Sequence, residues 1–230
     1  MVDYNEIDKF YKRLDLDEKN IETVVTAMWE NENSILIAAN SCKPALKSQK
    51  VQSHKTLPLA WGTVGNQGLG QRFDDWLSSK STIPGDIYGF MWDIAGEISQ
   101  LNGKQRQQLK TARVEETWHD MASVLVVGYG YDKPFILSVD DKGNTYVCDR
   151  EREFRAIGER AMLVARILYA AYKNGLMIDM SSEERMNYIT NIAAGMGVMA
   201  YDPAHMLRVT RSGVEDITNE KYRNLYYGRR

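Results

Sequence analysis

The sequence predicts an α+β protein in which antiparallel sheets pack against helices. Its β-rich runs come in neighbouring groups joined by polar turns, and its helical patterns come in separate groups. Strands that follow strands are typical of antiparallel sheets, whereas parallel sheets require a strict alternation of strands and helices. No repeat or linker divides the 230 residues. We therefore expect one main domain at 23–218, a helical extension at 1–22 and a tail at 219–230.

Nine strands are expected from runs of β-branched and aromatic residues between turn residues. Asp, Asn, Gly and Pro stand at the bends, where their backbone preferences favour tight turns. The clearest hairpin signal is the polar turn 30–33 between two apolar runs. The expected strands are 23–29, 34–39, 49–54, 57–63, 122–131, 135–139, 145–149, 206–210 and 214–217.

Five helices are expected from apolar residues spaced three and four positions apart. One helix should begin near Gly70 and continue to the Pro84-Gly85 breaker, because neither glycine nor proline interrupts it earlier. The segment 181–184 reads Ser-Ser-Glu-Glu, and a serine cap followed by early acids suits a helix N-terminus. The other expected helices are 4–20, 87–112, 158–174 and 182–200.

Composition argues against several classes of partner and cofactor. With 29 basic and 31 acidic residues the net charge is −2, which gives no electrostatic reason to expect nucleic acid or an anionic membrane. The longest apolar stretches are too short to span a bilayer, and the N-terminus lacks a secretory signal. Cys42 and Cys148 make no disulfide framework, and the three histidines lack zinc-type spacing. We expect a cytoplasmic protein with no cofactor, no metal, no nucleic acid and no membrane partner.

Two local patterns have a structural and a functional interpretation. The glycine-rich stretch 62–70 looks like a phosphate-binding loop, but it lacks the Lys-Ser/Thr ending and follows an antiparallel hairpin, so close strand–helix packing is the better interpretation. Acidic and basic residues alternate over 149–155. This pattern is typical of a solvated loop rather than an anion site.

Several sequences, in order along the chain, resemble the proteasome-like branch of the N-terminal-nucleophile (Ntn) hydrolases. The resemblance implies a four-layer αββα sandwich that assembles into a ring through its outer helices, 68–112 and 158–200. The partners would be further copies of this chain or other proteasome-like subunits, and any ATPase or regulator is left open. The matching segments are TVVTA (23–27), ILIAANS (35–41), the meander at 123–143, AIG (156–158), SSEE (181–184) and RSGVE (211–215).

The same resemblance implies a catalytic site. In the family, a threonine freed at the N-terminus uses its own amine as general base, a lysine lowers the pKa of that amine, and an aspartate positions the lysine. Carried over to this sequence, the threonine is Thr23, the lysine is Lys55 and the aspartate position holds Asn40. The oxyanion-hole glycine is Gly65.

Three departures from the family pattern argue against catalysis. Asn40 is neutral, so it accepts a hydrogen bond but cannot offset the charge of a lysine. Glu22 stands before Thr23, where self-cleaving members carry a glycine whose backbone freedom permits autolysis. Glu159 replaces the serine that follows the Ala-Ile-Gly turn. In addition, 22 residues precede Thr23, so its nitrogen is an amide without a basic lone pair.

Three functions remain open from the sequence. The first is a non-catalytic, proteasome-like subunit that acts by scaffolding, gating or binding. The alternative is a threonine-type peptidase precursor that uses Thr23 after residues 1–22 are removed. The third is a hydrolase of the same superfamily that acts on small amides.

Overall fold

A computed structural model describes residues 24–40, 50–83, 85–130, 132–148, 154–158, 161, 175, 179–193 and 204–218. Several predicted segments lie outside these residues. They are the helix at 4–20, nearly all of the helix at 158–174, the last turns of the helix at 182–200, and the tail at 219–230.

Within the described residues the strands form two five-stranded antiparallel sheets. In the first sheet the order is β10 (Gly213–Asp216), β9 (His205–Thr210), β2 (Ser34–Ala39), β1 (Val25–Asn31) and β8 (Phe154–Ile157). In the second sheet the order is β3 (Val51–Ser53), β4 (Leu59–Gly65), β5 (Ala122–Gly130), β6 (Lys133–Val139) and β7 (Thr145–Cys148).

The two sheets face each other across a buried apolar layer. Side chains alternate along β1, so Val25 and Ala27 point toward the second sheet while Thr26 between them points outward to a helix. Strands of both sheets contribute to this layer, including Ile37, Leu125 and Val127, all of them 0% exposed. Apolar side chains on two facing surfaces explain why the strands pair into a sandwich rather than one open sheet.

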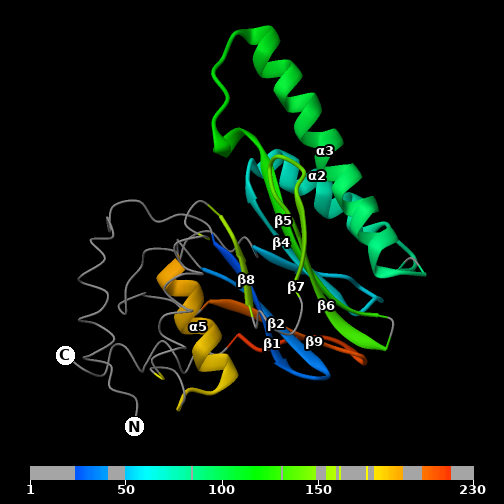
Figure 1. Cartoon of the computed structure of the whole chain (residues 1–230), viewed down its shortest axis with the longest axis vertical. Helices are drawn as coiled ribbons and strands as arrows, with labels where there is room; N and C mark the ends of the chain where they lie inside the picture. The colour runs from blue at the N-terminus through cyan, green and yellow to red at the C-terminus, as the bar shows by residue number, and fades with distance from the viewer. Residues whose placement is uncertain are drawn as a thin grey trace, which may run out of the picture.

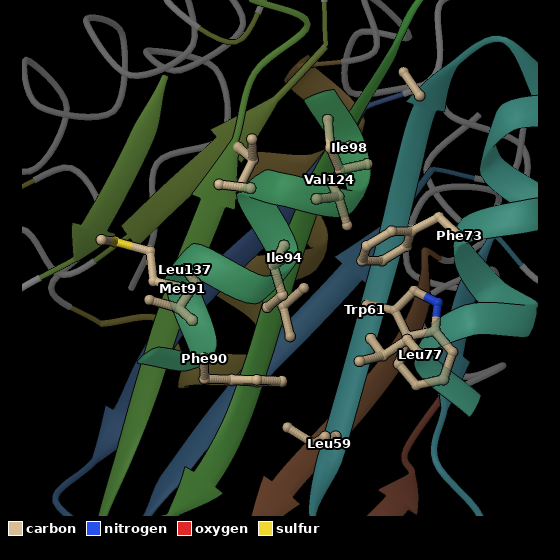
Figure 2. Packing of buried hydrophobic residues seen from close by; sticks show 14 of the residues in the cluster. Leu59, Trp61, Phe73, Leu77, Phe90, Met91, Ile94, Ile98, Val124 and Leu137 are labelled. Atoms are coloured by element: carbon tan, nitrogen blue, oxygen red, sulfur yellow. The ribbon is translucent and has the colours of Figure 1, made fainter. Parts of the chain in front are cut away.

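Helices α2 (Gln67–Ser78) and α3 (Ile87–Ala112) cover the outer face of the second sheet. Figure 2 shows their apolar side chains meeting those of β4, β5 and β6. The side-chain oxygens of Asn66 and Asp86 accept backbone N–H groups at the two helix N-termini. Phe90 and Phe135 meet edge to face with ring centroids 6.0 Å apart.

Helix α5 (Ser182–Ala193) covers the outer face of the first sheet, beside β1 and β2 (Figure 1). Its start is a capping box, because the Ser181 hydroxyl accepts the N–H of Glu184 and the Glu184 carboxylate accepts the N–H of Ser181. The described part of the chain is thus layered as helices, sheet, sheet and helix, as an α+β class predicts. A single 3₁₀ turn, η1 (Trp118–Asp120), leads into β5.

The strands and helices predicted from the sequence recur where the chain is described, with shifts at several ends. The two largest differences concern α2 and β8. Helix α2 ends at Ser78 instead of reaching Pro84, because the N–H and hydroxyl of Ser79 satisfy the last carbonyls of the helix. The second difference is β8, which lies partly in the segment expected to be a solvated loop. Arg155 of this strand donates to the Ser138 hydroxyl at 2.9 Å and stacks over the ring of Tyr146.

None of the helices in the described ranges combines the length and apolar character needed to cross a bilayer.

Candidate functional site

The predicted site lies where β1 begins. Thr23, the predicted nucleophile, and Glu22 before it lie outside the described residues, so the site is described from Val24 onward. Of the other predicted residues, Asn40, Lys55 and Gly65 are described, and each lies in a different local setting.

Asn40 anchors the first residue of this region. Its Oδ1 accepts the backbone N–H of Val24 at 2.8 Å, and its own N–H donates to the Val24 carbonyl at 3.3 Å. Asn40 is 1% exposed. A buried amide N–H without a partner would cost about 1–3 kcal/mol, so this side chain fixes the residue next to Thr23 by satisfying it.

Gly65 ends β4, where it pairs with Ala122. Its φ of +94° lies in the region that glycine alone adopts without strain. The turn carries the chain from β4 directly into Asn66, whose side chain accepts the N–H of Leu69 at 3.1 Å and starts α2. The backbone geometry at Gly65 is therefore set by the passage from strand to helix.

Lys55 lies in the exposed turn between β3 and β4. The turn is organised by His54, whose Nδ1 accepts the N–H groups of Thr56 at 3.1 Å and Leu57 at 3.0 Å. Gly65 is at the other end of β4, and six residues of strand span about 20 Å. The structure therefore does not bring Lys55 close to Gly65.

Another lysine, Lys50, lies closer to the start of β1. A β-carbon placed on Gly62 would be 2.8 Å from Cγ1 of Val25 and 3.2 Å from the carbonyl oxygen of Lys50. Gly62 thus lets β1 cross β4 closely, next to Lys50, which precedes β3. Close packing between the two sheets explains this glycine. The expected strand–helix packing is found at Gly70 of α2, where a β-carbon would be 2.6 Å from Oγ1 of Thr63 in β4. Lys50 precedes β3, whereas the predicted Lys55 follows it.

A cluster of ionised groups joins β1, β9 and α5 on the outer side of the first sheet. Arg208 holds Glu30 with two hydrogen bonds of 2.8 Å and donates to Glu183 at 2.8 Å. Burial opposes ionisation of Glu30, but hydrogen bonds from Arg208 and Ser34 outweigh it and lower the pKa of the carboxyl. The paired charges make this cluster a structural tie rather than an open anion site.

Chemically, the described part of the predicted site offers a hydrogen-bonded amide and a glycine turn. Among all the residues that the structure describes, no group of three or more His, Cys, Asp and Glu side chains is placed to hold a metal ion. No protein-family model matches the chain, and no curated protein matches its sequence. The fold and the site therefore define an α+β protein with two facing antiparallel sheets, and a more specific class rests on the proposal below.

Proposed function

We propose that the chain is a proteasome-like subunit of the Ntn hydrolase type that acts by assembly, with a site that is not catalytic. Support comes from the two facing antiparallel sheets between helices and from the ordered sequence resemblance along 23–217. In this proposal the subunit joins further copies or related subunits in a ring, where it scaffolds, gates or binds. Because one fold supports many functions, the non-catalytic role is inferred from the site itself.

The observation that carries the proposal is the hydrogen bond from the Val24 N–H to Oδ1 of Asn40. In the resembling family this position holds an aspartate that positions a lysine. Here the side-chain oxygen is engaged by backbone, the side chain is neutral, and the predicted Lys55 stays in an exposed turn. A site arranged in this way stabilises the start of a strand and supplies no charge to tune a base.

The test is the state of the Glu22–Thr23 bond in protein purified from its native host. Intact-mass measurement should find Thr23 still joined to Glu22, and an epoxyketone or β-lactone should leave the mass unchanged. A species that begins at Thr23 and gains the mass of one inhibitor would contradict the proposal.

Substitutions of Asn40 separate anchoring from catalysis. Asn40→Ala removes the acceptor and should lower the free energy of unfolding by about 1–3 kcal/mol. Asn40→Asp keeps an acceptor for Val24, and it is the matched control because it also restores the family's carboxylate. Denaturant titrations measure both variants. Unchanged stability in Asn40→Ala would remove the anchoring role.

The second candidate is the threonine peptidase precursor, and Lys50 favours it. The backbone carbonyl of this lysine lies beside Gly62, which packs on Val25, whereas Lys55 lies in the exposed turn between β3 and β4. If the precursor is processed, Lys50→Ala should abolish inhibitor labelling while Lys55→Ala leaves it unchanged. The small-amide hydrolase is tested by comparing wild type with Thr23→Ala on peptide and amide substrates, where equal rates would dispose of it.

A further inference from the structure

Helix α3 carries an exposed, uncharged stripe along its whole length. The helix has 26 residues, so it is about 39 Å long. Its first half packs on the second sheet, whereas no residue from Gly103 to Ala112 is buried. Figure 1 shows this second half continuing beyond the end of the sheet. The stripe consists of exposed residues that follow one another at three- and four-residue spacing: Tyr88, Trp92, Gly96, Ser99, Gly103 and Gln107. Ser99 lies at its inner edge, because a β-carbon on Gly143 of the β6–β7 turn would be 2.8 Å from the Ser99 hydroxyl oxygen.

The aromatic end of the stripe is unusually open to solvent. Tyr88 is 64% exposed and Trp92 is 66% exposed, and they lie one helical turn apart. Large exposed aromatics are enriched in protein interfaces, where each buries a large area at a small cost in side-chain entropy. The two glycines of the stripe lie farther along, and a β-carbon on Gly96 or Gly103 would meet nothing within 4 Å. They leave shallow space for a bulky side chain from outside.

The intervals between successive stripe residues are the same whether they are read from the N-terminal or the C-terminal end of α3. The stripe's successive members are four, four, three, four and four residues apart, as their numbers show. An antiparallel second copy of α3 therefore places Trp92 against Gly103 of that copy and Gly96 against its Ser99. The same operation repeats each contact, as a two-fold interface requires.

Charge along α3 fits the same antiparallel arrangement. The charged residues Asp86, Asp93 and Glu97 belong to the first half, and Lys104, Arg106, Lys110 and Arg113 belong to the second half or its cap. This distribution also suits the dipole of a single helix. Beyond that, it brings the acidic half of one copy onto the basic half of the other. Asp93 then lies within two residues, about 3 Å along the axis, of Lys104 in the second copy.

We propose that this stripe is an antiparallel two-fold contact between the α3 helices of two copies of the chain. The contact goes beyond the ring assembly proposed above and does not depend on it. Asp93 contacts Lys80 of its own chain at 3.8 Å, and its side chain remains 50% exposed, so a second cation can approach it.

Gly103→Leu is the sharpest substitution, because it separates folding from association. Leucine has a higher helix propensity than glycine, so the thermal midpoint of the isolated chain should hold or rise. The new side chain occupies the space that Trp92 of the second copy would fill. Sedimentation equilibrium of the full chain should show a dissociation constant for self-association at least about 30-fold higher than in wild type, and Trp92→Ala should show a similar loss of affinity. If wild type assembles further through other surfaces, Gly103→Leu should halve its mass.

The orientation is tested by exchanging charges. Asp93→Lys and Lys104→Glu should each weaken self-association about tenfold, because each replaces two attractive pairs by two repulsive ones. An equimolar mixture of the two variants should associate as well as wild type. In the mixed dimer, position 93 of each chain again faces an opposite charge at position 104 of the other. Tyr146→Ser, which changes an aromatic residue outside the stripe that is 42% exposed, is the control and should leave the mass unchanged. A monomeric wild type at about 100 μM, a wild-type mass in Gly103→Leu, or no recovery in the mixture would overturn the proposal.

Discussion

The two helical layers of this protein are attached to their sheets by different chemistry. Helices α2 and α3 meet the second sheet through large apolar side chains such as Phe73, Phe90 and Trp61. Helix α5 meets the first sheet through polar contacts as well, with Thr190 bonded to Thr26 and Glu183 bonded to Arg208. Apolar contacts tolerate small shifts, whereas buried polar contacts require each partner in place. Both layers contain such contacts, because Asn102 of α3 exchanges two hydrogen bonds of 2.9 Å with the backbone of Ala122 in β5. The α5 layer differs by its ion pair between Glu183 and Arg208.

The largest effect is expected in the apolar layer. Phe73 is 0% exposed, so Phe73→Ala should leave a cavity and lower the free energy of unfolding by about 3–5 kcal/mol. Denaturant titration measures the loss. Val114→Ala is the control, because Val114 is 54% exposed and its truncation should cost less than about 0.5 kcal/mol. A loss below about 1 kcal/mol for Phe73→Ala would contradict the packing described above.

A smaller but still substantial effect is expected from the charged tie beside α5. Arg208→Leu leaves Glu30 and Glu183 without their shared cation and should cost about 2 kcal/mol. The matched control is Arg211→Leu, since Arg211 is 76% exposed in its pair with Asp132 and such pairs contribute little. Equal free energies of unfolding for the two variants would show that the Arg208 cluster stabilises the fold no more than an exposed ion pair does.

The hydroxyl pair between β1 and α5 should contribute less. Thr190→Val preserves the shape and leaves the buried hydroxyl of Thr26 with a poorer set of partners, so we expect a loss of about 1 kcal/mol. Adding Thr26→Val should recover part of that loss, because replacing both partners leaves no unsatisfied group. A double-mutant cycle measures the coupling, and strictly additive losses would contradict the pairing.

The smallest effect is a difference in acid sensitivity between the two layers. The pKa of Glu30 is lowered in the fold from its ordinary value of 4.5, so its stabilising contribution is present above that value and is lost as the pH falls through the lowered pKa. Asp74 of α2 behaves oppositely. Burial raises its pKa, against the hydrogen bond from Trp61, so protonation of Asp74 relieves a cost of folding.

Hydrogen exchange between about pH 6 and pH 3, corrected for intrinsic rates, measures this difference. Protection in β1 and α5 should fall before protection in α2. Glu30→Gln should remove most of the difference, and an earlier loss of protection in α2 would contradict the assignment of the two carboxyls.

Local signals in the sequence predicted most of the fold, and the failures were non-local. Hairpins such as β1–β2 were predictable because their strands and turn are adjacent in the chain. Strand β8 was missed because charged residues precede it and its partner β1 lies far away in sequence, with Val25 opposite Ile157. Arg208 and Glu30 are 178 positions apart, so no local sequence pattern predicts their contact.

The candidate site was only partly predictable for the same reason. Asn40 follows β2 directly, and a hairpin brings it back to Val24, so its proximity to the start of β1 followed from the turn. The surroundings of Lys50 depend on how β4 crosses β1, which is a tertiary arrangement. Spacing along the chain does not say that the Lys50 carbonyl lies beside Gly62 and Val25, because this proximity comes from the packing of β4 on β1.

We propose that Asn40 anchors the start of β1 and that this region is not a catalytic centre. The most direct measurement uses a chain prepared to begin at Thr23, which supplies the free amine that the sequence otherwise lacks. We predict that an epoxyketone inhibitor adds no mass to this chain, because a neutral Asn40 bonded to Val24 provides no charge to position a lysine. A stoichiometric adduct on Thr23, absent in a chain carrying Thr23→Ser with its amine blocked, would contradict the claim and establish a latent peptidase.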